Sequence, residues 1–158
     1  MRRSLGITAL LLALAMPAAA RADDASLLRA YTSKATALKA QDKQIVRLTK
    51  RWQSHRAKFG PRIVKVLKRQ QATLFTVAGA VQRETESSPN GAQAKKLCLA
   101  SLKAMGQGDS AAIRAFVADR HHHAAKAVRS FKAAVKLQRK GRKLDKRAAA
   151  AFHAAGVL

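Results

Sequence analysis

The chain has 158 residues, with 32 lysines and arginines against eight acidic residues, and a formal charge of +24. One cysteine and 4% aromatic residues in a chain of this length fit a single domain without an internal disulfide. Scarce carboxylates argue against acid–base catalysis, and few aromatic residues are left to stack on nucleic-acid bases. The charge itself indicates attraction to polyanions and says nothing about the fold.

The first 22 residues are typical of a secretory signal peptide. Arg2 and Arg3 form a short positive segment, an apolar core covers 7–16, and residues 20–22 form a small-x-small cleavage sequence. The apolar core is too short to span a bilayer, although an uncleaved anchor and a twin-arginine signal are alternatives. Cleavage removes three arginines and lowers the formal charge from +24 to +21. We therefore expect a secreted or periplasmic protein whose mature chain begins at Asp23.

Two runs of residues predict two long helices that fold back on each other. In the first run a large apolar residue recurs at every seventh position, which keeps these residues on one seam: Tyr31, Leu38, Ile45, Trp52 and Phe59. The second run has the 4-3 spacing of a helix packed along its length: Ile63, Leu67, Gln70, Leu74, Val77 and Val81. Gly60 and Pro61 lie between the runs and predict a turn there, with the first helix extending from near Asp24 or Ser26 to about Lys58. Pairing the runs about this turn predicts that Trp52 contacts Gln70.

After the hairpin the sequence predicts a loop and a short helix. The segment 87–91 reads Ser-Ser-Pro-Asn-Gly, the clearest loop in the chain. A helix is expected over 92–105, closed by Gly106 and Gly108. Cys98 lies on its apolar side, so we expect a small buried residue there, with a disulfide to another chain as the alternative.

The last predicted helix begins at Asp109 or Ser110 and carries residues at 4-3 spacing as far as residue 138. Gly141 interrupts a basic run, and we expect the basic, Ala-rich tail over 141–158 to be frayed. The predicted fold is all-α, an antiparallel helical hairpin extended to a four-helix bundle over 23–140. An elongated hairpin with the last two helices laid along it is the alternative.

The cluster of histidines at 121–123 is the most conspicuous candidate for a metal site. Successive helical residues point about 100° apart, so these three side chains do not converge on one ion. Asp119 shares a helix face with His122 and His123, but di-iron bundles need two Glu-x-x-His motifs and two further glutamates. We expect a polar helix face here, with no metal, no cofactor and no catalytic residue, because no catalytic or phosphate-binding motif is present.

The distribution of charge predicts binding of anionic polymers or surfaces. Between residues 43 and 83 there are eleven basic residues and no acidic one, and a second basic run covers 136–147. The predicted binding residues are Lys43, Arg47, Lys50, Arg51, Arg139, Lys140, Arg142, Lys143, Lys146 and Arg147. The expected partners are anionic envelope polymers, anionic lipid surfaces or nucleic acid bound without sequence preference, and a protein partner is an alternative. The rival function is an extracytoplasmic holdase-like chaperone or adaptor that grips proteins with its long helices; a membrane-active protein is a third.

Overall fold

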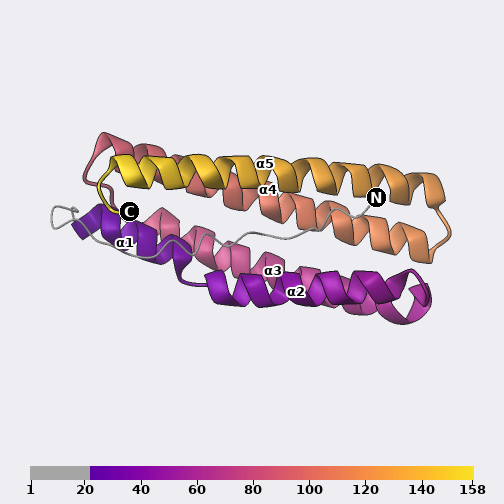
Figure 1. The fold of residues 1–158 in the computed structure, drawn as a ribbon. Helices are drawn as coiled ribbons and strands as arrows, with labels where there is room; N and C mark the ends of the chain where they lie inside the picture. Colours follow the sequence, from indigo (N-terminus) through magenta and orange to yellow (C-terminus); the bar gives the residue numbers. More distant parts are fainter. Residues whose placement is uncertain (1–21) are drawn as a thin grey trace.

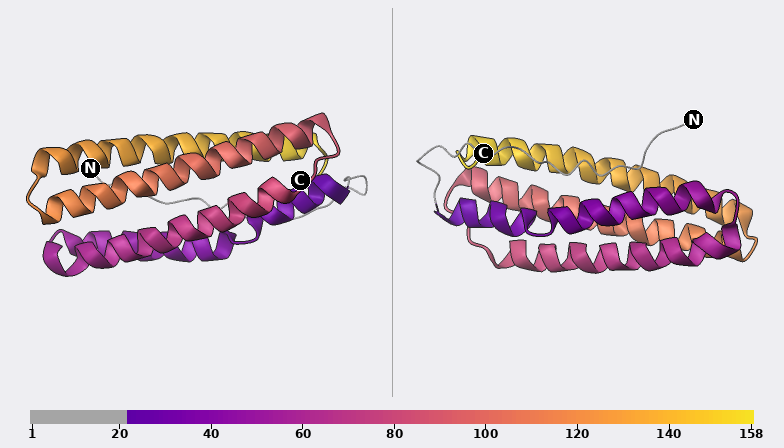
Figure 2. Two further views of the ribbon diagram at one scale, coloured as in Figure 1. Left: turned by 180° about the vertical axis from the view of Figure 1, so that it is seen from behind. Right: turned by 60° about the horizontal axis from the view of Figure 1, so that its bottom comes forward.

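The computed structural model describes residues 22–158, so the expected signal peptide lies outside the described residues except for its last one. The described chain forms an elongated bundle (Figure 1). Its helices are α1 (Ala22–Thr32), α2 (Ala35–Trp52), α3 (Arg56–Arg83), α4 (Pro89–Arg120) and α5 (Ala124–Ala154). α1 and α2 together follow one edge, and α3, α4 and α5 run back and forth beside them (Figure 2). The fold is an all-α helical bundle, as the sequence predicts.

Two clusters of apolar side chains form the core at different levels of the bundle. The larger one contains Leu27, Leu74, Val77, Val81, Ala94, Leu97, Cys98, Leu102, Met105, Ala148, Phe152 and Val157. The smaller one is built around Ile63, Leu67 and Phe116. Cys98 is buried and free, which confirms the prediction of a small core residue. Burial of this apolar surface is the main force that holds the helices together.

The first predicted helix is divided in two. α1 ends at Thr32 and α2 begins at Ala35, so one continuous helix from Asp24 to Lys58 was wrong. The hydroxyls of Thr32 and Ser33 donate hydrogen bonds to the carbonyls of Leu28 and Ala30. The backbone N–H of Ser33 bonds to the carbonyl of Ala30, three residues before it, and this tighter turn closes α1.

The turn of the hairpin lies before the glycine and proline that were expected to form it. α2 ends at Trp52, and Gly60 and Pro61 lie inside α3. The buried Gly60 packs against Trp52: a Cβ on Gly60 would lie 3.8 Å from Nε1 of that indole. Gly60 thus lies at an ordinary packing distance from the indole, and the register differs from the predicted one. Gln70 bonds to Asp42, ten residues before Trp52, so the expected Trp52–Gln70 pairing was wrong.

α4 runs without interruption through the glycines that were expected to end a short helix. Ser88 caps it, because its Oγ accepts a hydrogen bond from the N–H of Gly91 at 2.9 Å. Gly108 lets α5 approach closely, since a Cβ there would lie 3.0 Å from Nε2 of Gln138. Asp109 is consequently a buried residue in the middle of α4 and not a helix cap.

The segment expected to fray is part of α5, which continues to Ala154. Gly141 allows another close approach, because a Cβ there would lie 2.7 Å from Cγ of Met105 on α4. The hydroxyl of Ser101 also donates a hydrogen bond to the carbonyl of Gly141 at 2.9 Å. Ala148 and Phe152 beyond it are buried in the larger core cluster. Packing against α4 therefore outweighs the low helix propensity of glycine.

Candidate polyanion-binding surface

The cationic side chains of the described residues point outward. All of their lysines and arginines are exposed except Lys39, Lys95 and Arg142, which are half-buried. The eleven basic residues between 43 and 83 are all in the exposed group. Their positions on the outer faces of α2 and α3 follow from the apolar seams, which occupy the inner faces.

The acidic side chains are mostly held inside the molecule. Asp24, Asp42 and Asp109 are buried. Three more are half-buried, and each has a partner: Glu84 accepts a hydrogen bond from Ser26, Asp119 pairs with Arg56, and Asp145 accepts one from Tyr31.

Of the eight carboxylates, only Asp23 and Glu86 are exposed, and Glu86 forms an ion pair with Lys95 at 3.0 Å. The outer surface of the described chain is therefore more one-sidedly basic than the composition alone implies.

The predicted binding residues of α2 share one exposed face. Lys43, Arg47, Lys50 and Arg51 recur at spacings of three and four residues, which brings them onto neighbouring turns of the helix. Like charges at these spacings repel each other, and within the described residues no ion pair to a carboxylate reduces this repulsion. An anion along this face would remove that repulsion.

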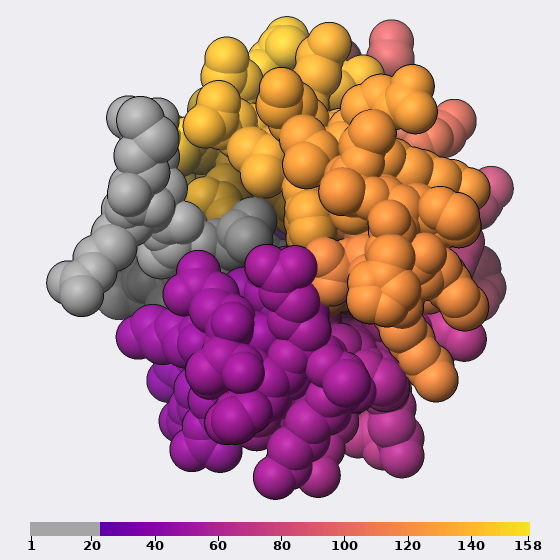
Figure 3. Space-filling model, turned by 90° about the vertical axis from the view of Figure 1, so that its right-hand side faces the viewer, coloured from indigo at the N-terminus to yellow at the C-terminus, as the bar shows by residue number. Residues whose placement is uncertain are grey.

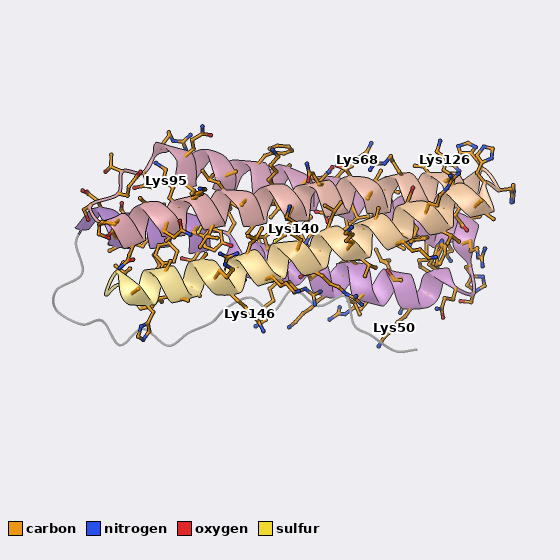
Figure 4. All side chains as sticks on the ribbon, turned by 90° about the horizontal axis from the view of Figure 1, so that it is seen from above. Lys50, Lys68, Lys95, Lys126, Lys140 and Lys146 are labelled. Atoms are coloured by element: carbon orange, nitrogen blue, oxygen red, sulfur yellow. The ribbon has the colours of Figure 1, made fainter. Side chains whose placement is uncertain are left out.

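The predicted binding residues of α5 are exposed with one exception. Arg139, Lys140, Lys143 and Arg147 lie on one face, and Lys146 is exposed as well. Figure 4 shows Lys50 of α2 and Lys146 of α5 along the same side of the bundle, whereas Lys68 and Lys95 lie along the opposite edge. Lys50 and Lys146 thus place positive charge from α2 and α5 on a common side.

Arg142 differs from its neighbours. Its side chain is half-buried and lines a cavity between the helices, and its Nε has no hydrogen-bond partner among the described residues. Arg142 is one of the predicted binding residues, yet only part of its side chain is accessible to an anion. The reason is its place one turn after Gln138, on the side of α5 that faces the bundle interior.

The histidines lie in the connection between α4 and α5 and not on a helix. All three are exposed, and His122 has a left-handed backbone with φ of 59°. This connection and the turn between α2 and α3 meet at one end of the molecule (Figure 3), where Arg56 Nη1 lies 3.3 Å from Asp119 Oδ1. In the described part of the chain, no three His, Cys, Asp or Glu residues are grouped to hold a metal ion.

A second candidate site, which the sequence did not predict, lies in the bundle interior. Its polar residues come from four helices: Asp42 on α2, Gln70 on α3, Asp109 on α4, and Gln138 and Arg142 on α5. Burial, together with the nearby Asp42 carboxylate, raises the pKa of Asp109 to about 8, although a hydrogen bond from Gln138 opposes this shift. The sequence signal for this site is a polar residue at a seam position on each helix. Asp42 and Gln70 visibly interrupt the apolar seams of their helices, whereas Asp109 has the appearance of a helix cap.

No protein-family model, curated protein or solved structure matches this chain. None of the described helices is both long enough and apolar enough to cross a membrane. The function is therefore argued from the surface and the interior of the molecule.

Proposed function

We propose that the protein is a non-catalytic polyanion-binding protein that uses the exposed basic faces of α2 and α5. One observation carries this proposal: six of the eight acidic side chains are buried or half-buried, while nearly all of the cations are exposed. A basic protein that is merely soluble has no need to hide its carboxylates. Their placement leaves a surface on which a phosphate or sulfate polymer meets little repulsion.

The mode of binding is electrostatic and independent of sequence. Lysine and arginine on neighbouring helical turns neutralise successive negative charges, and each neutralised phosphate releases a condensed counterion. No helix of the described chain carries exposed aromatic residues in a series that would stack on bases. We expect similar affinities for duplexes of unrelated sequence.

We further propose that the protein acts outside the inner membrane, after removal of residues 1–22. In that compartment the available polyanions are envelope polymers such as lipopolysaccharide or teichoic acids, anionic lipid surfaces and released nucleic acid. No cofactor or metal is part of this proposal.

The holdase or adaptor function has less support. A protein that grips unfolded clients presents a continuous apolar surface. The large exposed apolar residues of the described chain are Phe75, Val117 and Val128, which come from three different helices. Only Phe75, with 75% of its surface exposed, resembles an anchor for a protein partner.

A panel of ligands tests the proposal. The mature chain would be titrated with a fluorescent duplex of random sequence, a sulfated polysaccharide, anionic vesicles and neutral vesicles. We expect binding to the first three and none to neutral vesicles. Suppression of the aggregation of an unfolded client at high salt, without polyanion binding at low salt, would overturn the proposal in favour of the holdase.

A further inference from the structure

A cavity of about 280 Å³ lies between α2, α3, α4 and α5. Its walls are polarised along the bundle axis. Trp52, Phe116 and Phe131 line one end, and their rings meet edge to face with centroids 5.0–6.0 Å apart. Asp109 and Gln138 line the other end, two helical turns away on α4 and α5. Such a mostly apolar cavity with a few convergent polar groups is typical of a small-molecule site.

The polar end contains three buried atoms that have no hydrogen-bond partner in the described part of the chain. They are Oδ2 of Asp109, Oε1 of Gln138 and Nε of Arg142. Asp109 has only 1% of its surface exposed, and its other oxygen accepts a hydrogen bond from Nε2 of Gln138 at 2.9 Å. Buried polar atoms in proteins are almost always paired, and leaving them unpaired costs free energy. These three atoms therefore indicate a missing partner.

The chemistry of the missing partner follows from the three atoms. The Asp109 and Gln138 oxygens accept hydrogen bonds, and the N–H of Arg142 donates one. Arg142 lies one helical turn beyond Gln138. A ligand with a donor group and an acceptor group on adjacent carbons can therefore donate to Gln138 and accept from Arg142. Arginine binds carboxylates well, because its planar guanidinium matches their geometry.

We propose that this cavity binds a free α-amino acid with an apolar or aromatic side chain. Its ammonium group favours the ionised form of Asp109 and donates to Asp109 and Gln138, and its carboxylate accepts from Arg142. Its side chain lies against Trp52, Phe116 and Phe131. The cavity volume is near the lower end of small-ligand sites, about 300 Å³, which limits the ligand to this size. This proposal does not rest on the proposed function, because the ligand is electrically neutral and lies between the helices.

Trp52 provides a specific reporter, since it is the only tryptophan of the chain and lies in the cavity wall. The mature protein would be titrated with L-phenylalanine while the emission of Trp52 is recorded, and calorimetry would confirm the stoichiometry. Phenethylamine lacks the carboxylate and 3-phenylpropionate lacks the ammonium. We expect saturable 1:1 binding of phenylalanine and at least about tenfold weaker binding of either analogue.

Two variants and a control locate the ligand. Asp109→Asn puts an N–H donor where the ligand ammonium needs an acceptor, and Arg142→Gln removes the guanidinium, so each should weaken phenylalanine binding at least about tenfold. Asp23→Asn removes an exposed carboxylate and should leave binding unchanged. Circular dichroism would confirm that both cavity variants fold, and loss in either folded variant supports the proposal. Absence of binding at millimolar phenylalanine would overturn it and indicate a water-filled cavity, and so would equal binding of phenethylamine.

Discussion

Gln70 on α3 donates a hydrogen bond from Nε2 to Oδ1 of Asp42 on α2 at 2.6 Å. Both residues are buried, so this bond joins the two arms of the hairpin inside the bundle. One turn away, Nε2 of Gln41 donates to Oγ1 of Thr73 at 3.1 Å. These two polar contacts form in only one register of α2 along α3, because any other register leaves the carboxylate without this donor.

Gln70→Leu should therefore destabilise the protein. The substitution removes a hydrogen bond to a buried carboxylate, and we expect a loss of about 1.5–3 kcal/mol in the free energy of unfolding. Gln44→Leu is the matched control, because Gln44 is exposed on α2. Urea denaturation followed by circular dichroism measures both variants. Equal stability of the two would show that the Asp42–Gln70 bond does not hold the register.

The pH dependence of stability should contain a contribution from Asp109. Its folded-state pKa of about 8 lies above the ordinary value of 3.8, so the folded protein retains a proton that the unfolded chain releases between these values. The contribution of Asp109 to the free energy of unfolding consequently falls as pH rises from about 4 to about 8, and it levels off above about pH 8. The half-buried Asp145, whose pKa burial also raises, contributes in the same direction.

Asp109→Asn isolates this contribution, because asparagine keeps the shape and does not ionise. We expect the Tm of the variant to match that of the original protein near about pH 4 and to exceed it near about pH 9. The control Asp23→Asn changes an exposed carboxylate and should show no such divergence. A difference in Tm that is the same at both pH values would contradict the placement of Asp109 in a desolvated site.

Two glycines of α4 should respond oppositely to alanine. A Cβ at Gly91 would lie 2.0 Å from Oδ1 of Asp24, the carboxylate that holds the N–H of Ser87 and the hydroxyl of Ser88. Gly91→Ala displaces this carboxylate and should lower the free energy of unfolding by about 2 kcal/mol or more. At Gly106 a Cβ would meet nothing within 4 Å, so alanine there should stabilise the helix by about 0.5–1 kcal/mol. Thermal unfolding compares the pair, and a stabilising Gly91→Ala would refute the packing of α1 against the loop before α4.

The proposed export predicts a defined N-terminus for the mature protein. The mature protein should begin at Asp23 because the sequence before it has the features of a signal peptide. N-terminal sequencing of the protein from the periplasm or the medium checks this. Recovery of the intact chain from the cytoplasm, with Met1 retained, would instead favour a nucleoid-like role.

The sequence predicted the fold class because apolar periodicity depends on which helix faces are buried, and those faces are repeated many times. It placed helix ends poorly, because glycine has two uses that look alike in sequence. Gly108 and Gly141 read as helix ends, yet each lies inside a helix where a neighbour approaches closely. Only the partner helix, which is distant in sequence, distinguishes the two uses.

The candidate sites were likewise predictable only in part from local sequence patterns. Outward placement of the basic residues was predictable, since it depends only on local periodicity. Arg142 and Asp109 were misplaced because their environment is set by α5 packing on α4. An interior cavity depends on how four helices meet, and no local pattern encodes it.

Salt dependence of duplex DNA binding tests the central claim most directly. If about six phosphates are neutralised, log K should fall linearly with log salt with a slope of about −5, a loss of roughly a thousandfold between about 50 and 200 mM. Replacing the exposed Arg139, Lys140, Lys143 and Arg147 of α5 by glutamine should make the slope clearly shallower. The control replaces as many exposed cations elsewhere, namely Arg29, Lys34, Lys96 and Lys103, and should retain most of the slope. A flat salt response, or identical slopes for the two variants, would contradict charge-driven binding through α5.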